Sequence, residues 1–150
     1  KVQPAPQPPF VSNGVAAAAQ TLVLPNIAKD GVVKLSTIRQ QLERSGNLEL
    51  QQLCLLRECE ILGILGRNVC AVDGLVCLRR TGDETIDPFR GFLIGLLRKR
   101  GRAVRRTELM EGAAAALGAA PTNAVYTKCL SDLCVSRGST WVMKGNGNSG

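Results

Sequence analysis

Apolar residues recur at intervals of three or four along much of this chain, and short β-rich runs lie between these stretches. The clearest helical stretch is 87–100, where the apolar positions share one wide face and Gly101 ends the pattern. Asp87 is expected to cap this helix, with Pro88 in its first turn. The pattern therefore predicts an amphipathic helix whose buried face is made of Phe89, Phe92, Leu93, Leu96 and Leu97.

Two more helices and a hairpin are predicted after it. Residues 103–105 are a short extended piece, and Thr107 is expected to cap a helix that ends at Gly118. Thr122 is expected to cap the next helix, whose buried side would be formed by Val125, Cys129, Leu130 and Leu133.

The run CVSRGSTWVMKG is typical of a closing hairpin with its turn around Arg137-Gly138-Ser139. Trp141 begins the return strand and is expected to anchor the core rather than to stack on a base.

The beginning of the chain follows the same order less clearly. Residues 15–24 predict a short Ala-rich helix that ends near Pro25, and 32–34 predict a brief strand after an Asp30-Gly31 turn. Ser36 is expected to cap a helix over 37–45 that Gly46 closes, with Leu35, Ile38 and Leu42 on one face.

Residues 48–65 predict one further helix, buried through Leu50, Leu53, Cys54, Leu56 and Ile61. Two β-rich runs then flank Asp73-Gly74, a strong hairpin signal because both turn positions need a positive φ. A two-residue turn places Val72 opposite Leu75, Ala71 opposite Val76 and Cys70 opposite Cys77.

The repeated order of elements predicts an α+β, mostly helical chain with two tandem winged-helix domains. Each would have three helices, a short strand and a β-hairpin wing. The expected boundaries are 1–12 for a Pro-rich linker, 13–82 and 83–145 for the two domains, and 146–150 for a flexible tail.

Cysteine usage indicates reduced thiols. No secretion signal is visible, and most of the six cysteines lie in apolar patterns, where Cys acts as a small hydrophobe. Opposed Cys70 and Cys77 could form a disulfide, but two packed thiols are favoured. A zinc site is not expected, because the chain has no His and no CxxC pair.

Residues 86–145 are similar to a known family. FLIGLLRKRGRAVRRTELMEGAAAAL followed by KCLSDLCVS, a Gly turn and WVMKG resembles the C-terminal extension of the fifth polymerase-specific subunit of RNA polymerase III, the larger member of its TFIIF-like accessory pair. For residues 13–80 the likeness rests on element order and a looser pattern, and the first helix departs from the family in being short and Ala-rich. The resemblance implies a nuclear, non-catalytic subunit that carries winged helices on a flexible linker.

Positive charge is concentrated in the second half of the chain. Residues 1–75 hold seven Lys/Arg and six Asp/Glu, whereas 76–150 hold twelve and six. Three interpretations stay open for the densest cations: contact with nucleic-acid phosphates, docking on an acidic protein surface, or a solvated face. The candidate binding residues are Arg98, Lys99, Arg100, Arg102, Arg105, Arg106, Lys128, Arg137 and Lys144.

The chain lacks a recognisable constellation for catalysis. It has no His to act as a general base, and no nucleotide-binding loop or nucleophile motif. Gly91 and Gly95 indicate close helix packing rather than a phosphate cradle. We therefore expect a non-enzymatic protein without cofactor or metal, whose partners are other RNA polymerase III subunits and promoter DNA backbone, with no membrane or small-molecule substrate.

In this interpretation the chain supports complex integrity and transcription initiation in the nucleus. The alternative is a free-standing winged-helix DNA-binding transcription regulator. The last predicted helix exposes one Lys, one Asp and no Arg that could read guanine, which favours backbone contact or protein scaffolding over sequence readout.

Overall fold

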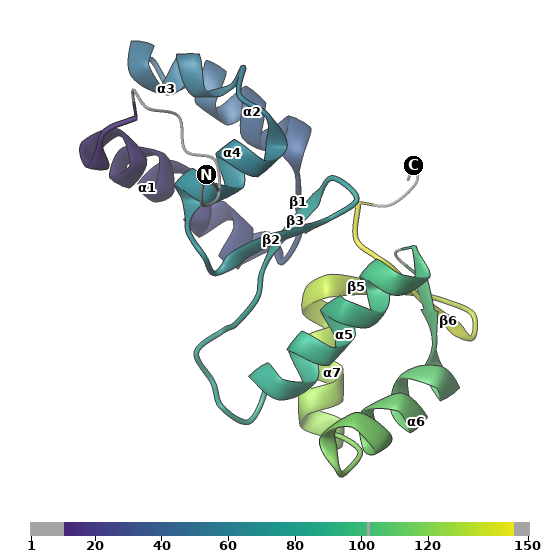
Figure 1. The fold of residues 1–150 in the computed structure, drawn as a ribbon. Helices are drawn as coiled ribbons and strands as arrows, with labels where there is room; N and C mark the ends of the chain where they lie inside the picture. The colour runs from purple at the N-terminus through teal and green to yellow at the C-terminus, as the bar shows by residue number, and fades with distance from the viewer. Residues whose placement is uncertain (1–10, 102, 146–150) are drawn as a thin grey trace, which may run out of the picture.

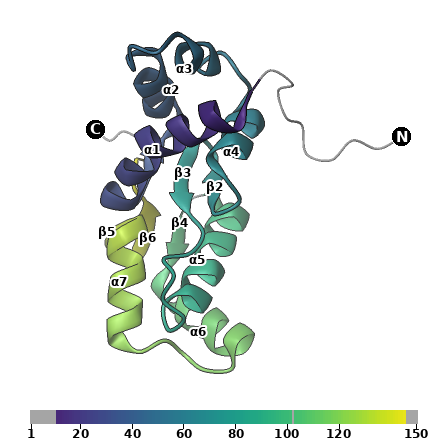
Figure 2. The same cartoon turned by 90° about the vertical axis from the view of Figure 1, so that its left-hand side faces the viewer.

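The protein folds into two similar halves, stacked end to end in Figures 1 and 2. The computed structural model describes residues 11–101 and 103–145. The expected linker and tail thus fall largely outside the described residues. We call 13–82 the first half and 83–145 the second half, following the predicted boundaries. The α+β class with a large helical content is confirmed, and each half contributes one small antiparallel sheet.

The first helix, α1 (Asn13–Asp30), is much longer than predicted. Ser12 caps it by accepting a hydrogen bond from the Val15 amide. Pro25 does not end the helix, although it cannot donate the usual backbone hydrogen bond. The helix continues because Val23 and Ile27, on either side of the proline, are both fully buried in the core.

Two predictions for the middle of the first half are wrong. The helix α2 (Leu35–Glu43) follows β1 (Val33–Lys34) directly, so Lys34 rather than Ser36 occupies the cap position. The single helix expected over 48–65 is two helices, α3 (Leu48–Leu53) and α4 (Glu58–Leu65). Arg39 holds the turn between them by donating to the carbonyls of Cys54 and Leu56. The first half therefore has four helices rather than three.

The predicted hairpin of the first half is confirmed, including its register. Strands β2 (Val69–Val72) and β3 (Leu75–Leu78) pair as expected, from Val72 opposite Leu75 to Cys70 opposite Cys77. Asp73 and Gly74 form the turn with φ of 56° and 84°. Because β1 pairs with β3, the strand order is β1-β3-β2.

The second half begins with α5 (Asp87–Arg100), which ends at Gly101 as predicted. Asp87 does not cap this helix. Its carboxylate instead accepts hydrogen bonds from Thr81 and Gly82, and so holds the connection between the halves. Burial raises the pKa of Asp87, but these hydrogen bonds outweigh it and the pKa lies below its usual range.

The rest of the second half follows the predicted order closely. It comprises β4 (Ala103–Arg105), α6 (Arg106–Leu117), α7 (Asn123–Leu133), β5 (Cys134–Arg137) and β6 (Thr140–Met143). Thr122 caps α7 as expected, whereas Arg105 rather than Thr107 precedes α6. Trp141 packs against the core as predicted, and its indole donates to the Tyr126 hydroxyl at 2.6 Å.

The two sheets share the same design. The strand order β4-β6-β5 repeats β1-β3-β2, and Val104 opposite Trp141 matches Val33 opposite Val76. In each half the amide that opens the helix after the first strand donates to the hairpin turn: Leu35 to Gly74 at 2.9 Å and Arg106 to Ser139 at 3.2 Å. This tertiary hydrogen bond explains why neither Ser36 nor Thr107 acts as the cap.

The halves pack on one another through buried contacts. Cys70, Val72, Leu75 and Cys77 of the first hairpin belong to the same hydrophobic cluster as the core of the second half. Arg90 of α5 is only 3% exposed, and its Nε donates to the Leu78 carbonyl at 2.9 Å. Gly31 lies so close to α7 that an added Cβ would be 1.8 Å from the Asp132 carbonyl oxygen. The two halves are thus held by specific contacts and not only by their connection.

The packing role predicted for Gly91 and Gly95 is wrong. A Cβ added to either would meet nothing within 4 Å, and both face solvent. The close approach in this half occurs at Gly112 instead, where an added Cβ would lie 2.8 Å from the Phe92 ring.

Candidate functional site

The predicted basic cluster lies where α5 ends and α6 begins. Arg98, Lys99 and Arg100 occupy the last turn of α5, where positive charge also interacts favourably with the helix dipole. Arg105 ends β4 and Arg106 opens α6, while Arg102 lies outside the described residues. The fold therefore keeps the described members of the cluster close to one corner of the second half.

Several of these cations have partners within the protein. The guanidinium of Arg98 donates to the Ala71 carbonyl of β2, at 3.3 Å from Nε and 3.2 Å from Nη2. Arg100 forms an ion pair with Glu108, and Arg106 lies over the Tyr126 ring at 5.5 Å. Lys99 and Arg105 form no hydrogen bond or ion pair through their side chains with another residue in 11–101 or 103–145. These two are the cluster members most available to a partner.

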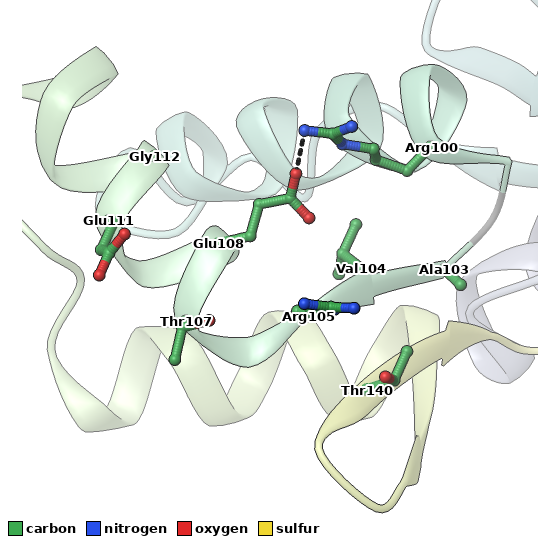
Figure 3. Close-up of a pocket in the computed structure, with 9 residues that line it drawn as sticks. All are labelled: Arg100, Ala103, Val104, Arg105, Thr107, Glu108, Glu111, Gly112 and Thr140. Carbon is green, nitrogen blue, oxygen red and sulfur yellow. Dashed lines mark ion pairs between the residues drawn. The ribbon is translucent and has the colours of Figure 1, made fainter.

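A wide groove opens beside this corner, and Figure 3 shows the side chains that line it. This α6 groove, bounded by the end of α5, by β4 and by α6, has a volume of about 850 Å³. Arg100 and Arg105 face it, but so do Glu108 and Glu111. With two basic and two acidic side chains, the groove offers no net charge to attract an anion.

The other predicted binding residues lie on separate elements. Lys128 on α7 is paired with Asp132, 3.4 Å away, and Arg137 is exposed at the end of β5. Lys144 follows β6 and its Nζ donates to the Asp30 carbonyl at 3.3 Å, so it contacts the first half. The structure therefore does not gather these three cations with the basic cluster.

The helix that directly precedes each hairpin carries little positive charge. On α7 the exposed side chains other than Ala124 are polar, with Lys128 as the only cation of that helix. On α4, which precedes the first hairpin, the charged residues are Glu58 and Glu60. Neither helix offers an arginine that could read a guanine edge.

A second groove crosses the joint between the halves, and no sequence pattern indicated it. This joint groove has a volume of about 480 Å³ and is bounded by α4, by β2 with the end of β3, and by α5. Arg67, Arg79 and Arg98 line it together with one acidic residue, Glu58. It is therefore the more positively charged of the two grooves, although Arg67 and Arg79 lie outside the densest run of cations in the sequence.

The cysteines differ sharply in environment. Cys59 is exposed, whereas Cys70 and Cys77 are buried with their sulfur atoms 3.7 Å apart. Hydrogen bonding to Cys77 and nearby arginines lower the pKa of Cys70 to about 7, while the shared hydrogen bond and burial raise that of Cys77. Burial also raises the pKa of Cys129 to about 11 and that of Cys134 to about 12.

No known family model matches the chain, and no curated protein matches its sequence. None of the helices in 11–101 and 103–145 combines the length and apolar character needed to cross a membrane. In the same ranges, no three His, Cys, Asp or Glu side chains gather in a way that would hold a metal ion.

Proposed function

We propose that the chain is a tandem winged-helix segment that serves as a non-catalytic docking module. The support for two winged helices is the repeated strand order, the equal register and the matching hydrogen bond between helix start and hairpin turn in each half. The extra helix α3 is an insertion in the first unit, between the helices that precede its hairpin.

The proposed setting is RNA polymerase III in the nucleus, where this segment would belong to the fifth polymerase-specific subunit. The resemblance of residues 86–145 to that family supports the assignment. In this role the segment supports complex integrity and transcription initiation through contacts with other polymerase subunits, and promoter DNA backbone is a further partner.

The observation that carries the docking role is the chemistry of the helix that directly precedes each hairpin, the third helix of a winged-helix unit. A DNA-reading winged helix inserts this helix into the major groove. Here α4 presents Glu58 and Glu60, and the single lysine of α7 is paired with Asp132. On α4, Glu60 is paired with Arg57 at the cap position, 3.5 Å away. Neither helix therefore offers surplus positive charge to phosphates, and protein contacts are the better use of both surfaces.

Affinity purification tests the polymerase assignment. The tagged chain is expected to recover RNA polymerase III subunits from nuclear extract, identified by mass spectrometry, whereas the tag alone recovers none. Recovery of other complexes without any polymerase III subunit would show that the assignment is wrong.

A mobility-shift titration separates the docking role from a sequence-specific regulator. The docking role predicts weak binding to duplex DNA that is independent of sequence and fades as salt is added. Substituting Lys99→Glu and Arg105→Glu together should abolish this residual binding. The control double substitution Lys29→Glu with Arg44→Glu, which changes the net charge equally at exposed positions of the first half, should leave most of it. Tight binding to one sequence at physiological salt would favour the regulator instead.

A further inference from the structure

We propose that the joint groove binds an acidic segment of a partner protein. This proposal goes beyond the polymerase assignment, because it concerns a surface and the chemistry of what binds there. Purification with polymerase subunits tests the assignment, while binding of a defined peptide tests the groove.

Three arginines from three places in the chain line the joint groove. Arg67 comes from the segment after α4, Arg79 from the end of the first hairpin, and Arg98 from α5 of the second half. Three arginines and one glutamate give the lining a net charge of +2. Arg98 is supplied by the second half, so the packing of the two halves raises the net charge of this lining from +1 to +2.

Two of the three arginines are available for a ligand, and the third is held in place beside them. Arg67 and Arg79 are exposed, and their side chains form no hydrogen bond or ion pair within the described parts of the chain. The Ala71 carbonyl anchors the guanidinium of Arg98 beside β2. Arginine pairs with carboxylates through two parallel hydrogen bonds, so this set of groups fits aspartate or glutamate side chains.

The walls between the arginines are largely apolar. Leu62 and Gly63 of α4 line the groove, with Val69 and Ala71 of β2. Gly63 is exposed and has no side chain, so a bound backbone can approach α4 closely at this point. A ligand that fits this lining carries apolar groups as well as negative charge.

A protein segment meets both requirements better than a nucleic acid does. A duplex presents closely spaced phosphates and would bring some of them near Glu58, the acidic residue of the lining. An acidic peptide places a few carboxylates on the arginines and apolar side chains on Leu62 and its neighbours. The α6 groove, with its balanced lining, lacks this preference.

The test is fluorescence anisotropy with the full chain and three labelled probes. The first is a peptide made only of Glu, Asp and Leu, the second replaces each Leu by Ser, and the third is a DNA duplex. Two variants are compared with the natural chain: the double substitution Arg67→Glu with Arg79→Glu, and the control double substitution Lys29→Glu with Arg44→Glu. The control changes the net charge by the same amount at exposed positions outside the groove. Circular dichroism checks that each variant folds, which is expected because the substituted side chains are exposed.

The proposal predicts that the Leu-containing peptide binds most tightly and that the double substitution weakens it by about tenfold or more. The control double substitution Lys29→Glu with Arg44→Glu should change its affinity by less than about twofold, since exposed charges at a distance are screened. Equal weakening by both variants would overturn the proposal, because it would indicate a response to net charge alone. Absence of peptide binding, or binding of DNA alone that the double substitution weakens, would also overturn it.

Discussion

The two hairpins have the same register but opposite surroundings on their outward faces. In the first hairpin every outward residue is apolar and at most 3% exposed, because the second half covers it; these residues are Cys70, Val72, Leu75 and Cys77. Strand alternation and equal register place Val135, Arg137, Thr140 and Val142 at the matching positions of the second hairpin, where Val135 is 42% exposed.

This difference shows how one architecture serves two purposes. The first hairpin acts as an internal surface that joins the halves, whereas the second remains open. The sequence shows the same contrast. The run VCAV-DG-LVCL is apolar on both faces, while apolar and polar residues alternate more clearly in CVSR-GS-TWVM. A strand that is apolar on both faces is typical of one that is covered on both sides.

The largest effect on stability is expected from adding a side chain at the point where the two halves touch. Gly31→Ala should lower the free energy of unfolding by roughly 3–4 kcal/mol, since its Cβ would collide with the Asp132 backbone as well as strain a φ of 84°. Gly46→Ala is the matched control, because it has a φ of 78° and open space, and should cost only about 1–2 kcal/mol. Urea unfolding followed by circular dichroism measures both. Equal losses would mean that the contact between the halves contributes little.

A reciprocal exchange between the hairpins should have an intermediate effect. Leu75→Thr places in the first hairpin the residue found at the matching position of the second, Thr140. It should lower the free energy of unfolding by about 2–3 kcal/mol, because Leu75 is buried. Thr140→Leu makes the opposite change at a partly exposed position and should alter stability by less than about 0.5 kcal/mol. Thermal unfolding of the two variants compares them directly. A comparable loss for Thr140→Leu would contradict the view that the second hairpin is open.

The smallest effect is expected at the contact that holds the open hairpin to α7. Tyr126→Phe removes the hydrogen bond from the Trp141 indole and should cost about 1 kcal/mol. Fluorescence of Trp141, the only tryptophan in the chain, follows urea unfolding of this half. Thr127→Ala, at the exposed neighbour, should stay within about 0.5 kcal/mol of the natural chain. An unchanged midpoint for Tyr126→Phe would show that the ring contacts alone hold the hairpin.

Local chemistry predicted most of the elements. Asp73-Gly74 determined the first hairpin and its register, and Thr122 and Gly118 marked true helix boundaries. The errors occurred where distant contacts decide. Burial on both sides of Pro25 extends α1, and the hydrogen bonds from Leu35 and Arg106 to hairpin turns start α2 and α6 earlier than their polar residues suggested.

The site was harder to predict than the fold. The sequence located the run of cations from Arg98 to Arg106. It could not show that Arg100 is paired with Glu108 or that Arg106 lies over the Tyr126 ring. The joint groove depends on how the halves pack, and Arg67 and Arg79 are isolated cations in the sequence. The sequence of the first hairpin, which is apolar on both faces, does indicate that another part of the protein covers its outward face.

Gly31, pressed against the backbone of α7, has a consequence for how this protein meets its partners. Because Gly31 has no side chain, the backbones of the two halves can come into direct contact at this point. This contact holds the two units at one relative orientation, which the Thr81–Asp87 connection alone would not do. A partner that binds both units at once therefore does not lose binding free energy by restricting their relative motion. The first contact brings the second into place at a high effective concentration, so two individually weak attachments add up to a durable one.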